Sequence, residues 1–277
     1  MKLATIRTGS GTKAVRITDD DQVIDLGAAD LGELLADPDW RDRAQAPGPV
    51  APGSIDDLDF APVIPRPPKI LCVGLNYRAH ITEMGREIPS HPTLFAKFTP
   101  PLIGARDDIV LPAASQAVDW EAELAVVVGA PLRHANAQEA ARAIAGYCVL
   151  NDVTARDWQY RTPQWLQGKT FADSTPVGPY LVTDLGHTDF ELAGLVDGEV
   201  VQSARTGDLV FDPPTLLAYI STILPLEPGD LIATGTPGGV GHSRTPARYL
   251  QPEQVLTTRI SGLGECVNVC RSEKLPS

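Results

Sequence analysis

The stretch DWEAELAVVV, residues 119–128, begins with acidic side chains and ends as a run suited to a protein interior. Successive side chains of a β-strand point to opposite faces, so Asp119, Glu121 and Glu123 would share one face with Ala125 and Val127. Both faces are apolar at the far end, which is typical of a strand covered on both sides. The stretch therefore predicts a core strand over residues 118–128 that carries carboxylates at one end.

Carboxylates on one strand face repel each other and lose hydration when they are buried. They need water, a raised pKa or a cation, and these residues alone leave exposure to water open. The next predicted core strand, residues 144–151, is followed by Asp152, where another apolar run stops. Acids at the ends of neighbouring strands can converge, and an all-oxygen cluster of Glu121, Glu123 and Asp152 would suit Mg²⁺, Mn²⁺ or Ca²⁺ better than zinc.

The composition is that of an ordinary folded protein, with 277 residues, 43% hydrophobic and 21% charged. Lys plus Arg number 23 against 35 for Asp plus Glu, and the net charge of −12 argues against nucleic acid, whose binding needs basic clusters. No apolar stretch reaches the roughly 20 residues of a membrane helix, and the N-terminus has no apolar signal-peptide core. We therefore expect a cytoplasmic protein without a membrane partner, whose four scattered cysteines are core thiols.

The order of the predicted elements indicates a β-rich α+β fold with two parts. A hairpin over 2–8 and 13–18 and helical pieces near 28–45 precede a proline-dense segment, 46–69, so we place a small N-terminal domain at 1–62 and a catalytic domain at 63–277. In the second part we predict a strand at 69–74, a helix at 76–85 with Asn76 as its cap, a helical segment at 135–144, a hairpin turning on Asp197-Gly198, and an amphipathic helix at 213–224. The glycine-rich segment GTPGGVG, residues 235–241, lacks the pattern of a phosphate-binding loop.

A histidine and a glutamate, His80 and Glu83, stand three residues apart on the helix predicted at 76–85. Such a pair are neighbours, and the carboxylate would raise the basicity of the imidazole, as in a general base; a surface ion pair is the alternative. Arg156, Gln159 and Lys169 follow the predicted metal acids and could hold a substrate carboxylate or a developing oxyanion. The remaining histidines, His91, His134, His187 and His242, have no partner pattern and are predicted to be structural or exposed.

Five blocks of sequence resemble one known family when they are taken in order. They are GLNYRAHITEMG, DWEAELAVVVG, YCVLNDVTARDWQ, GKTF…PVGPY and LIATGTPGGVG, and they span residues 74–241. Together the blocks resemble the fumarylacetoacetate hydrolase family in its small, acylpyruvase-like branch. The resemblance implies a mixed β-roll preceded by a small N-terminal domain, a homodimer, and Mg²⁺ or Mn²⁺ bound by Glu121, Glu123 and Asp152.

The resemblance also implies roles for the remaining site residues. His80 would be the catalytic histidine, oriented by Glu83 in a segment that orders as a lid over the substrate, and Lys169 would be the catalytic lysine. Arg156, Gln159 and Thr236 would contact the substrate, and Asp119 would lie near the metal without binding it. The larger members of the family have a fourth metal acid at the position of Val73, so this chain departs from them.

The activity implied is hydrolysis of a C–C bond in a 2,4-dioxo acid, an acylpyruvate or fumarylpyruvate, through an enolate held by the metal. Oxaloacetate decarboxylation, or isomerisation of a 2-hydroxyhepta-2,4-diene-1,7-dioate in aromatic catabolism, would use the same residues and stays open. A dicarboxylate binder without catalysis and a metal-stabilised structural protein are the alternatives from other classes. Trp165 and Phe171 would line a distal pocket or belong to the core.

Overall fold

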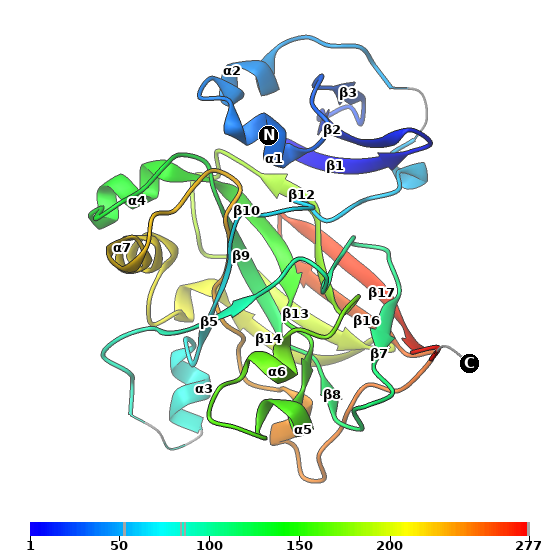
Figure 1. Ribbon diagram of the computed structural model, residues 1–277, viewed down its shortest axis with the longest axis vertical. Coiled ribbons are helices and arrows are strands. Elements are labelled where there is room, and N and C mark those ends of the chain that lie inside the picture. Colours follow the sequence, from blue (N-terminus) through cyan, green and yellow to red (C-terminus); the bar gives the residue numbers. More distant parts are fainter. Residues whose placement is uncertain (52–53, 84, 86, 276–277) are drawn as a thin grey trace.

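The computed structural model describes residues 1–51, 54–83, 85 and 87–275, with the side chain of Glu83 excepted. The fold is β-rich α+β, as predicted, and Figure 1 shows its helices as short pieces around the strands. None of the helices in the described part of the chain is long and apolar enough to cross a membrane.

The main sheet has ten strands in the order β3-β2-β1-β12-β10-β9-β15-β4-β5, with β6 paired to β12. Its strands are β1 (Lys2–Thr8), β2 (Gly11–Ile17), β3 (Val23–Asp25), β4 (Ile70–Gly74), β5 (Thr93–Lys97), β6 (Leu102–Ile103), β9 (Ala122–Val128), β10 (Ile144–Asn151), β12 (Thr175–Val182) and β15 (Leu231–Ala233). Every residue of β9 is buried, because the strand lies in the middle of the sheet and both of its faces are covered.

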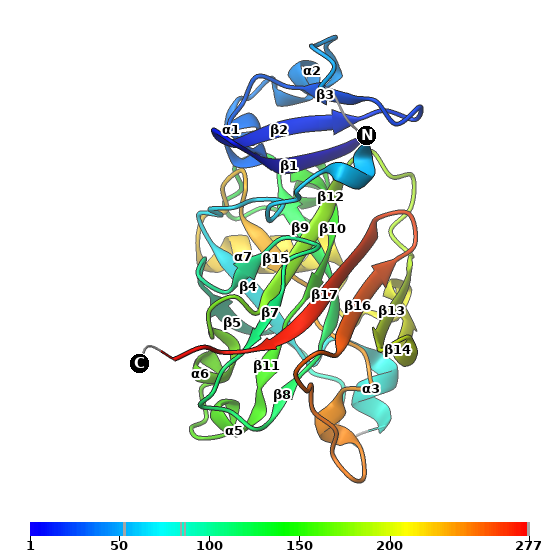
Figure 2. The same cartoon turned by 90° about the vertical axis from the view of Figure 1, so that its right-hand side faces the viewer.

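A second sheet of five strands lies against the main one, in the order β14-β13-β16-β17-β7, and Figure 2 shows the two together. Its strands are β7 (Ile109–Leu111), β13 (Glu191–Val196), β14 (Glu199–Arg205), β16 (Val255–Ile260) and β17 (Gly264–Ser272). The predicted hairpin turn joins β13 to β14, with positive φ at Asp197 and Gly198 as a two-residue turn of this type requires. The four cysteines are free and buried, as predicted.

The helices divide into three groups. α1 and α2 belong to the N-terminal segment, α4 and α7 lie side by side at one flank of the main sheet, and α3, α5 and α6 lie near its opposite end (Figure 1). Their bounds are α1 (Leu31–Ala36), α2 (Trp40–Gln45), α3 (Arg78–Glu83), α4 (Ala137–Ala143), α5 (Arg156–Gln159), α6 (Leu166–Lys169) and α7 (Pro213–Ile223), with 3-10 turns η1 (Ile55–Asp57), η2 (Thr206–Asp208) and η3 (Gly241–Ser243). α7 starts as predicted, with Asp212 as cap and proline in its first turn.

The single strand predicted at 118–128 is wrong, because the chain breaks between Asp119 and Ala122. A short strand, β8 (Val118–Asp119), pairs with β11 (Thr154–Ala155), whereas β9 pairs with β10 and β15. At the break the side-chain oxygen of Asn151 accepts the Glu121 N–H at 2.9 Å, and the Glu121 carbonyl accepts the Asp152 N–H at 2.9 Å. The side chain of Asn151 on β10 thus takes the place of a backbone hydrogen bond between the strands, and the chain can turn here.

The N-terminal segment extends the main sheet, because β1 pairs antiparallel with β12. Leu31, Leu34 and Trp40 share one buried apolar cluster with Val127 of β9 and Leu231 of β15. The Trp40 indole also donates a hydrogen bond to the Gly129 carbonyl at 3.2 Å. The division of the chain at residues 62 and 63 stays a prediction.

Trp40→Ala should lower the free energy of unfolding by about 3–5 kcal/mol, the usual cost of truncating a buried aromatic residue. Because the cluster joins both parts of the chain, urea denaturation followed by circular dichroism should still show one transition. Val50→Ala, at a side chain that is 59% exposed, is the control and should change the stability by less than about 0.5 kcal/mol. An early transition of the N-terminal segment alone in Trp40→Ala would contradict this coupling.

Candidate metal centre and active-site cavity

Three carboxylates meet at one end of β9 and β10. Glu123 lies on β9 opposite Leu150 of β10, Asp152 directly follows β10, and Glu121 lies at the break before β9. One oxygen from each carboxylate lies within 4.8 Å of the others. Glu121, Glu123 and Asp152 are 7%, 1% and 0% exposed, so the alternative of a strand end exposed to water is wrong.

Two lysines neutralise part of this cluster. Lys169 Nζ lies 2.7 Å from Glu121 Oε2 and 2.8 Å from Asp152 Oδ2, and Lys97 Nζ lies 2.6 Å from Asp152 Oδ1. Burial favours a neutral Asp152, but the ammonium groups of Lys169 and Lys97 outweigh it and lower the pKa of that carboxyl. Burial likewise opposes the charge of Lys169, but Asp152 and Glu121 outweigh it and raise its pKa, so the amine stays protonated near neutral pH.

The sequence analysis missed Lys97, which ends the strand TLFAK of β5. Nothing in that strand distinguishes the lysine, because its partner Asp152 lies 55 positions away. Lys169, which the sequence did identify, reaches the cluster because α6 packs closely on α5. A Cβ on the preceding residue, Gly168, would lie 2.5 Å from the Gln159 nitrogen, so this approach requires glycine.

Glu123 is the carboxylate whose negative charge is least balanced by neighbouring groups. Its carboxylate accepts a hydrogen bond from the Gly235 N–H at 2.8 Å. Burial, followed by the charges of Asp152 and Glu121, raises the pKa of Glu123 well above its usual range. An all-oxygen donor set with excess negative charge fits a hard divalent cation such as Mg²⁺ or Mn²⁺. The three residues predicted as metal ligands are therefore brought together in a form that suits the ion.

Arg156 and Gln159 stand one turn apart on α5 and bond to each other, Arg156 Nη1 to Gln159 Oε1 at 2.9 Å. Arg156 also binds Glu121 Oε1 through Nη1 at 2.7 Å and Asp119 Oδ2 through Nε at 2.8 Å. Burial acts against the charge of the guanidinium, but Glu121 and Asp119 raise its pKa further, so it is always cationic. In this structure Arg156 orients acids, and both residues line the cavity where the sequence predicts substrate contacts.

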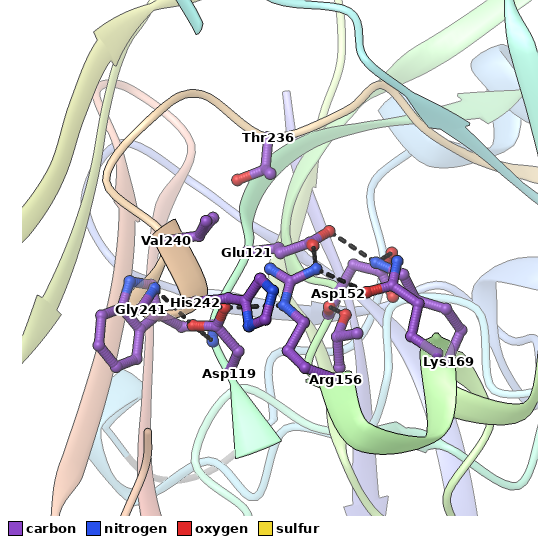
Figure 3. Close-up of polar contacts among 12 residues, drawn as sticks. Asp119, Glu121, Asp152, Arg156, Lys169, Thr236, Val240, Gly241 and His242 are labelled. Atoms are coloured by element: carbon purple, nitrogen blue, oxygen red, sulfur yellow. Dashed lines mark hydrogen bonds and ion pairs between the residues drawn. The ribbon is translucent and has the colours of Figure 1, made fainter. Parts of the chain in front are cut away.

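Asp119 connects the cluster to the glycine-rich loop at 235–241 (Figure 3). Besides Arg156, its carboxylate accepts the N–H groups of Trp120 at 2.8 Å, Gly241 at 2.7 Å and His242 at 3.0 Å. Thr236, in the same loop, donates to the Ala122 carbonyl at 3.0 Å and accepts from Gln202 Nε2 at 2.8 Å. The loop is therefore fixed to both β8 and β9.

His80 lies on α3 and its half-buried side chain lines the cavity. The prediction that Asn76 caps this helix is wrong. Its side chain donates instead to the carbonyls of Phe211 at 3.0 Å and Thr234 at 2.8 Å, and so ties the start of α3 to two distant loops. Glu83 ends α3, but its side chain, and with it the predicted His80–Glu83 pair, lies outside the described residues.

A cavity of about 300 Å³ opens beside the carboxylates. Of the two aromatic residues for which a pocket or a core position was left open, Trp165 lines the cavity, whereas Phe171 packs on Trp158 with ring centroids 5.4 Å apart. His242 also lines it, although the sequence analysis assigned this histidine no role. The complete lining consists of Val73, Gly74, Leu75, His80, Phe95, Glu121, Glu123, Arg156, Gln159, Tyr160, Trp165, Lys169, Thr236, Val240, His242 and Ser243.

Comparison with known proteins identifies the family. Residues 69–271 match the family model described as "Fumarylacetoacetate (FAA) hydrolase C-terminal". The human protein named "Oxaloacetate tautomerase FAHD2A, mitochondrial" is 43% identical over 225 residues, which cover 79% of this chain and 71% of that protein. The cytoplasmic location expected from the sequence therefore stays a prediction.

Two solved structures resemble the whole chain, each match covering 99% of it and 100% of the other protein. The fumarylacetoacetate hydrolase of Exiguobacterium antarcticum has a TM-score of 0.87 at 31% identity. The 5-carboxymethyl-2-hydroxymuconate delta-isomerase of Mycobacterium smegmatis has a TM-score of 0.81 at 32% identity. The resemblance seen in the sequence is confirmed: this chain belongs to the fumarylacetoacetate hydrolase family.

Proposed function

We propose that the protein is a metal-dependent enzyme that forms the enolate of a 2-oxo acid, and that its reaction is the tautomerisation of oxaloacetate or a similar acid. The observation that carries the proposal is the set of three carboxylate oxygens within 4.8 Å of one another, beside a cavity that His80 also lines. The 43% identity to the human oxaloacetate tautomerase favours this reaction within the family.

Glu121, Glu123 and Asp152 would hold the divalent cation. When bound, the cation would supply Lewis acidity, which lowers the cost of negative charge on the 2-oxo oxygen of the substrate. Lys169 contributes a fixed positive charge to the same end of the cavity, because its ammonium is held between Glu121 and Asp152. Asp152 and Glu121 raise the pKa of Lys169 and favour its charged form, so we assign it the role of binding and stabilising negative charge.

His80 is then the group that moves the proton. Its imidazole would accept a proton from the carbon next to the oxo group, and the C–H electron pair would form the C=C bond of the enolate. The C=O π electron pair moves to the oxygen, which takes a proton from water to give the enol, and the hydroxide left behind takes the proton held by His80. Reversal of these steps returns the keto form, so the reaction needs no further reactant.

Hydrolysis of a 2,4-dioxo acid is the second candidate, favoured by the 31% identity to a fumarylacetoacetate hydrolase over the whole chain. Here His80, oriented by Glu83, would take a proton from water, and the hydroxide would attack the distal carbonyl carbon. The bond between that carbon and its neighbour breaks, and its electron pair yields the enolate of pyruvate, which is then protonated. A homodimer, as the resemblance implies, stays part of this proposal.

Identification of the products separates the candidate reactions. The protein should be incubated with Mg²⁺ or Mn²⁺ and oxaloacetate, acetylpyruvate, fumarylpyruvate or a hydroxydiene dioate. Loss of enol absorbance from oxaloacetate without carbon dioxide release indicates tautomerisation, and carbon dioxide indicates decarboxylation. Two acids from a dioxo acid indicate hydrolysis, and a product of equal mass from the hydroxydiene dioate indicates isomerisation. Absence of turnover on the whole panel would contradict the proposal and favour a binding protein.

His80→Ala should lower kcat on the substrate identified in that assay by about 10²-fold or more, because the proton loses its acceptor. His187→Ala is the matched control, since His187 is exposed and packs on Phe190 outside the cavity. Both variants should bind Mn²⁺ as the native protein does. Near-normal turnover of His80→Ala would remove His80 from the mechanism.

Glu123→Gln and Asp152→Asn should differ in the absence of metal. Asp152→Asn leaves two buried ammonium groups without their shared partner and should cost about 3–5 kcal/mol, seen as a lower melting temperature in EDTA. Glu123→Gln replaces a carboxyl whose charge is disfavoured by burial and by Asp152 and Glu121, and it keeps an acceptor for Gly235, so its melting temperature in EDTA should not fall. Both variants should lose Mn²⁺ binding in calorimetry. Equal melting temperatures of the two variants would contradict this division of roles.

A further inference from the structure

One histidine at the cavity has no part in the mechanism above. His242 lies in η3, after the glycine-rich loop, and it lines the cavity although much of its surface is exposed. Figure 3 shows it at the opposite end of the cluster from Lys169, with Arg156 between them. A substrate anchored beside Lys169 and extended through the cavity would therefore present its far end to His242.

His242 is held by one backbone contact and two contacts of its ring. Its backbone N–H binds Asp119 at 3.0 Å, its Nδ1 lies 3.0 Å from the Tyr249 hydroxyl, and its ring packs on Tyr160 with centroids 5.2 Å apart. Within the described part of the chain, Nε2 makes no hydrogen bond. The arrangement is that of an oriented side chain with one polar atom left for a ligand.

We propose that His242, supported by Tyr249, binds the terminal carboxylate of the substrate, so that the enzyme selects dicarboxylic 2-oxo acids over their monocarboxylic counterparts. This assignment rests on the proposed function for the identity of the reacting end. It adds a specificity-determining residue at the far end of the cavity.

The Tyr249 hydroxyl suits His242 to an anion. A hydroxyl either donates to Nδ1 or accepts from it, because its hydrogen rotates. With a carboxylate at Nε2, the favourable form places the ring proton on Nε2 while Tyr249 donates to Nδ1. The imidazolium form donates to the carboxylate as well, with Tyr249 as the acceptor at Nδ1.

The acids that act electrostatically on the neighbouring Tyr249 are Asp119 and Asp157, and both accept hydrogen bonds from other groups. Asp119 accepts four hydrogen bonds, one of them from the guanidinium of Arg156. Asp157 accepts the Ser115 hydroxyl at 2.6 Å and the Gln116 N–H at 3.3 Å. Arg156 remains as the buried cation between the two ends of the cavity and favours an anionic chain on either side.

The test uses pairs of acids that differ only in a terminal carboxylate or methyl group. Turnover is compared for oxaloacetate and 2-oxobutanoate, and for fumarylpyruvate and 2,4-dioxohept-5-enoate. Binding is compared by calorimetry with Mn²⁺ present, for 2-oxoglutarate and 2-oxopentanoate. The variants are His242→Phe, which keeps a ring to pack on Tyr160, His242→Gln, which keeps an N–H donor, and Tyr249→Phe.

In at least one pair the native protein should prefer the dicarboxylate, and His242→Phe should reduce that preference about tenfold or more, the effect of one hydrogen bond to a charged group. The change in His242→Phe should come mainly from a higher KM for the dicarboxylate. His242→Gln should restore part of the preference for the dicarboxylate, and Tyr249→Phe should reduce that preference less than His242→Phe does. Equal losses on both members of every pair, or no preference in the native protein, would overturn the assignment.

Binding separates this assignment from the proposed function. If the native protein turns over none of the acids but prefers 2-oxoglutarate to 2-oxopentanoate, and His242→Phe removes that preference, the proposed reaction fails and the role of His242 stands. If turnover occurs and the preference is unchanged in His242→Phe, the reaction stands and the role of His242 fails.

Discussion

The burial of four carboxylates beside three cations determines the architecture of this site. Asp119, Glu121, Glu123 and Asp152 are all buried, and so are Lys97, Arg156 and Lys169. Charges cannot be removed from water in this number unless each finds a partner at close range, because the loss of hydration is several kcal/mol for each ion. The cations come from β5, α5 and α6, so the pairs also hold these elements to the end of β9 and β10. Glu123 is the member of this cluster whose pKa is raised, by burial and by the charges of Asp152 and Glu121. The same arrangement of charges that fixes the fold here brings together a cluster that could hold a divalent cation.

Much of the fold could be predicted from local patterns. The apolar runs of β9 and β10, the Asp197-Gly198 turn and the prolines at the start of α7 each depend on neighbouring residues, and each prediction is confirmed. The errors concern features that depend on distant partners. The break after Asp119 needs the side chain of Asn151, and Asn76 leaves its expected capping position because the backbone at Phe211 and Thr234 competes for it. A local pattern of apolar and polar residues does not reveal which distant residue will contact a given side chain.

The residues of the site also fall into those that could be predicted from local sequence and those that depend on distant partners. The acids of the cluster and Lys169 could be found from the sequence, because they stand in specific motifs whose order matches a family. Lys97 could not, since its partner Asp152 lies 55 positions away and the strand TLFAK resembles any edge strand. His242 was missed for the same reason: its orientation comes from Asp119, 123 positions earlier, and from Tyr249. A side chain whose role is set by tertiary contacts carries no local signature.

These contacts explain how one family can contain a tautomerase, a hydrolase and an isomerase. In the mechanism that we propose, forming an enolate requires only the carboxylate cluster, its fixed ammonium and a base, and these are built on strands and on helices packed against them. The far end of the cavity is built differently, from the loop that follows β15 and from the turn η3. Asp119 joins these two ends of the cavity, because it binds Arg156 on one side and the N–H groups of Gly241 and His242 on the other. The backbone bonds hold the loop in place whatever side chain stands at position 242. If His242 has the role that we propose, substrate selection can change at that position while the charge balance at the reacting end is left intact.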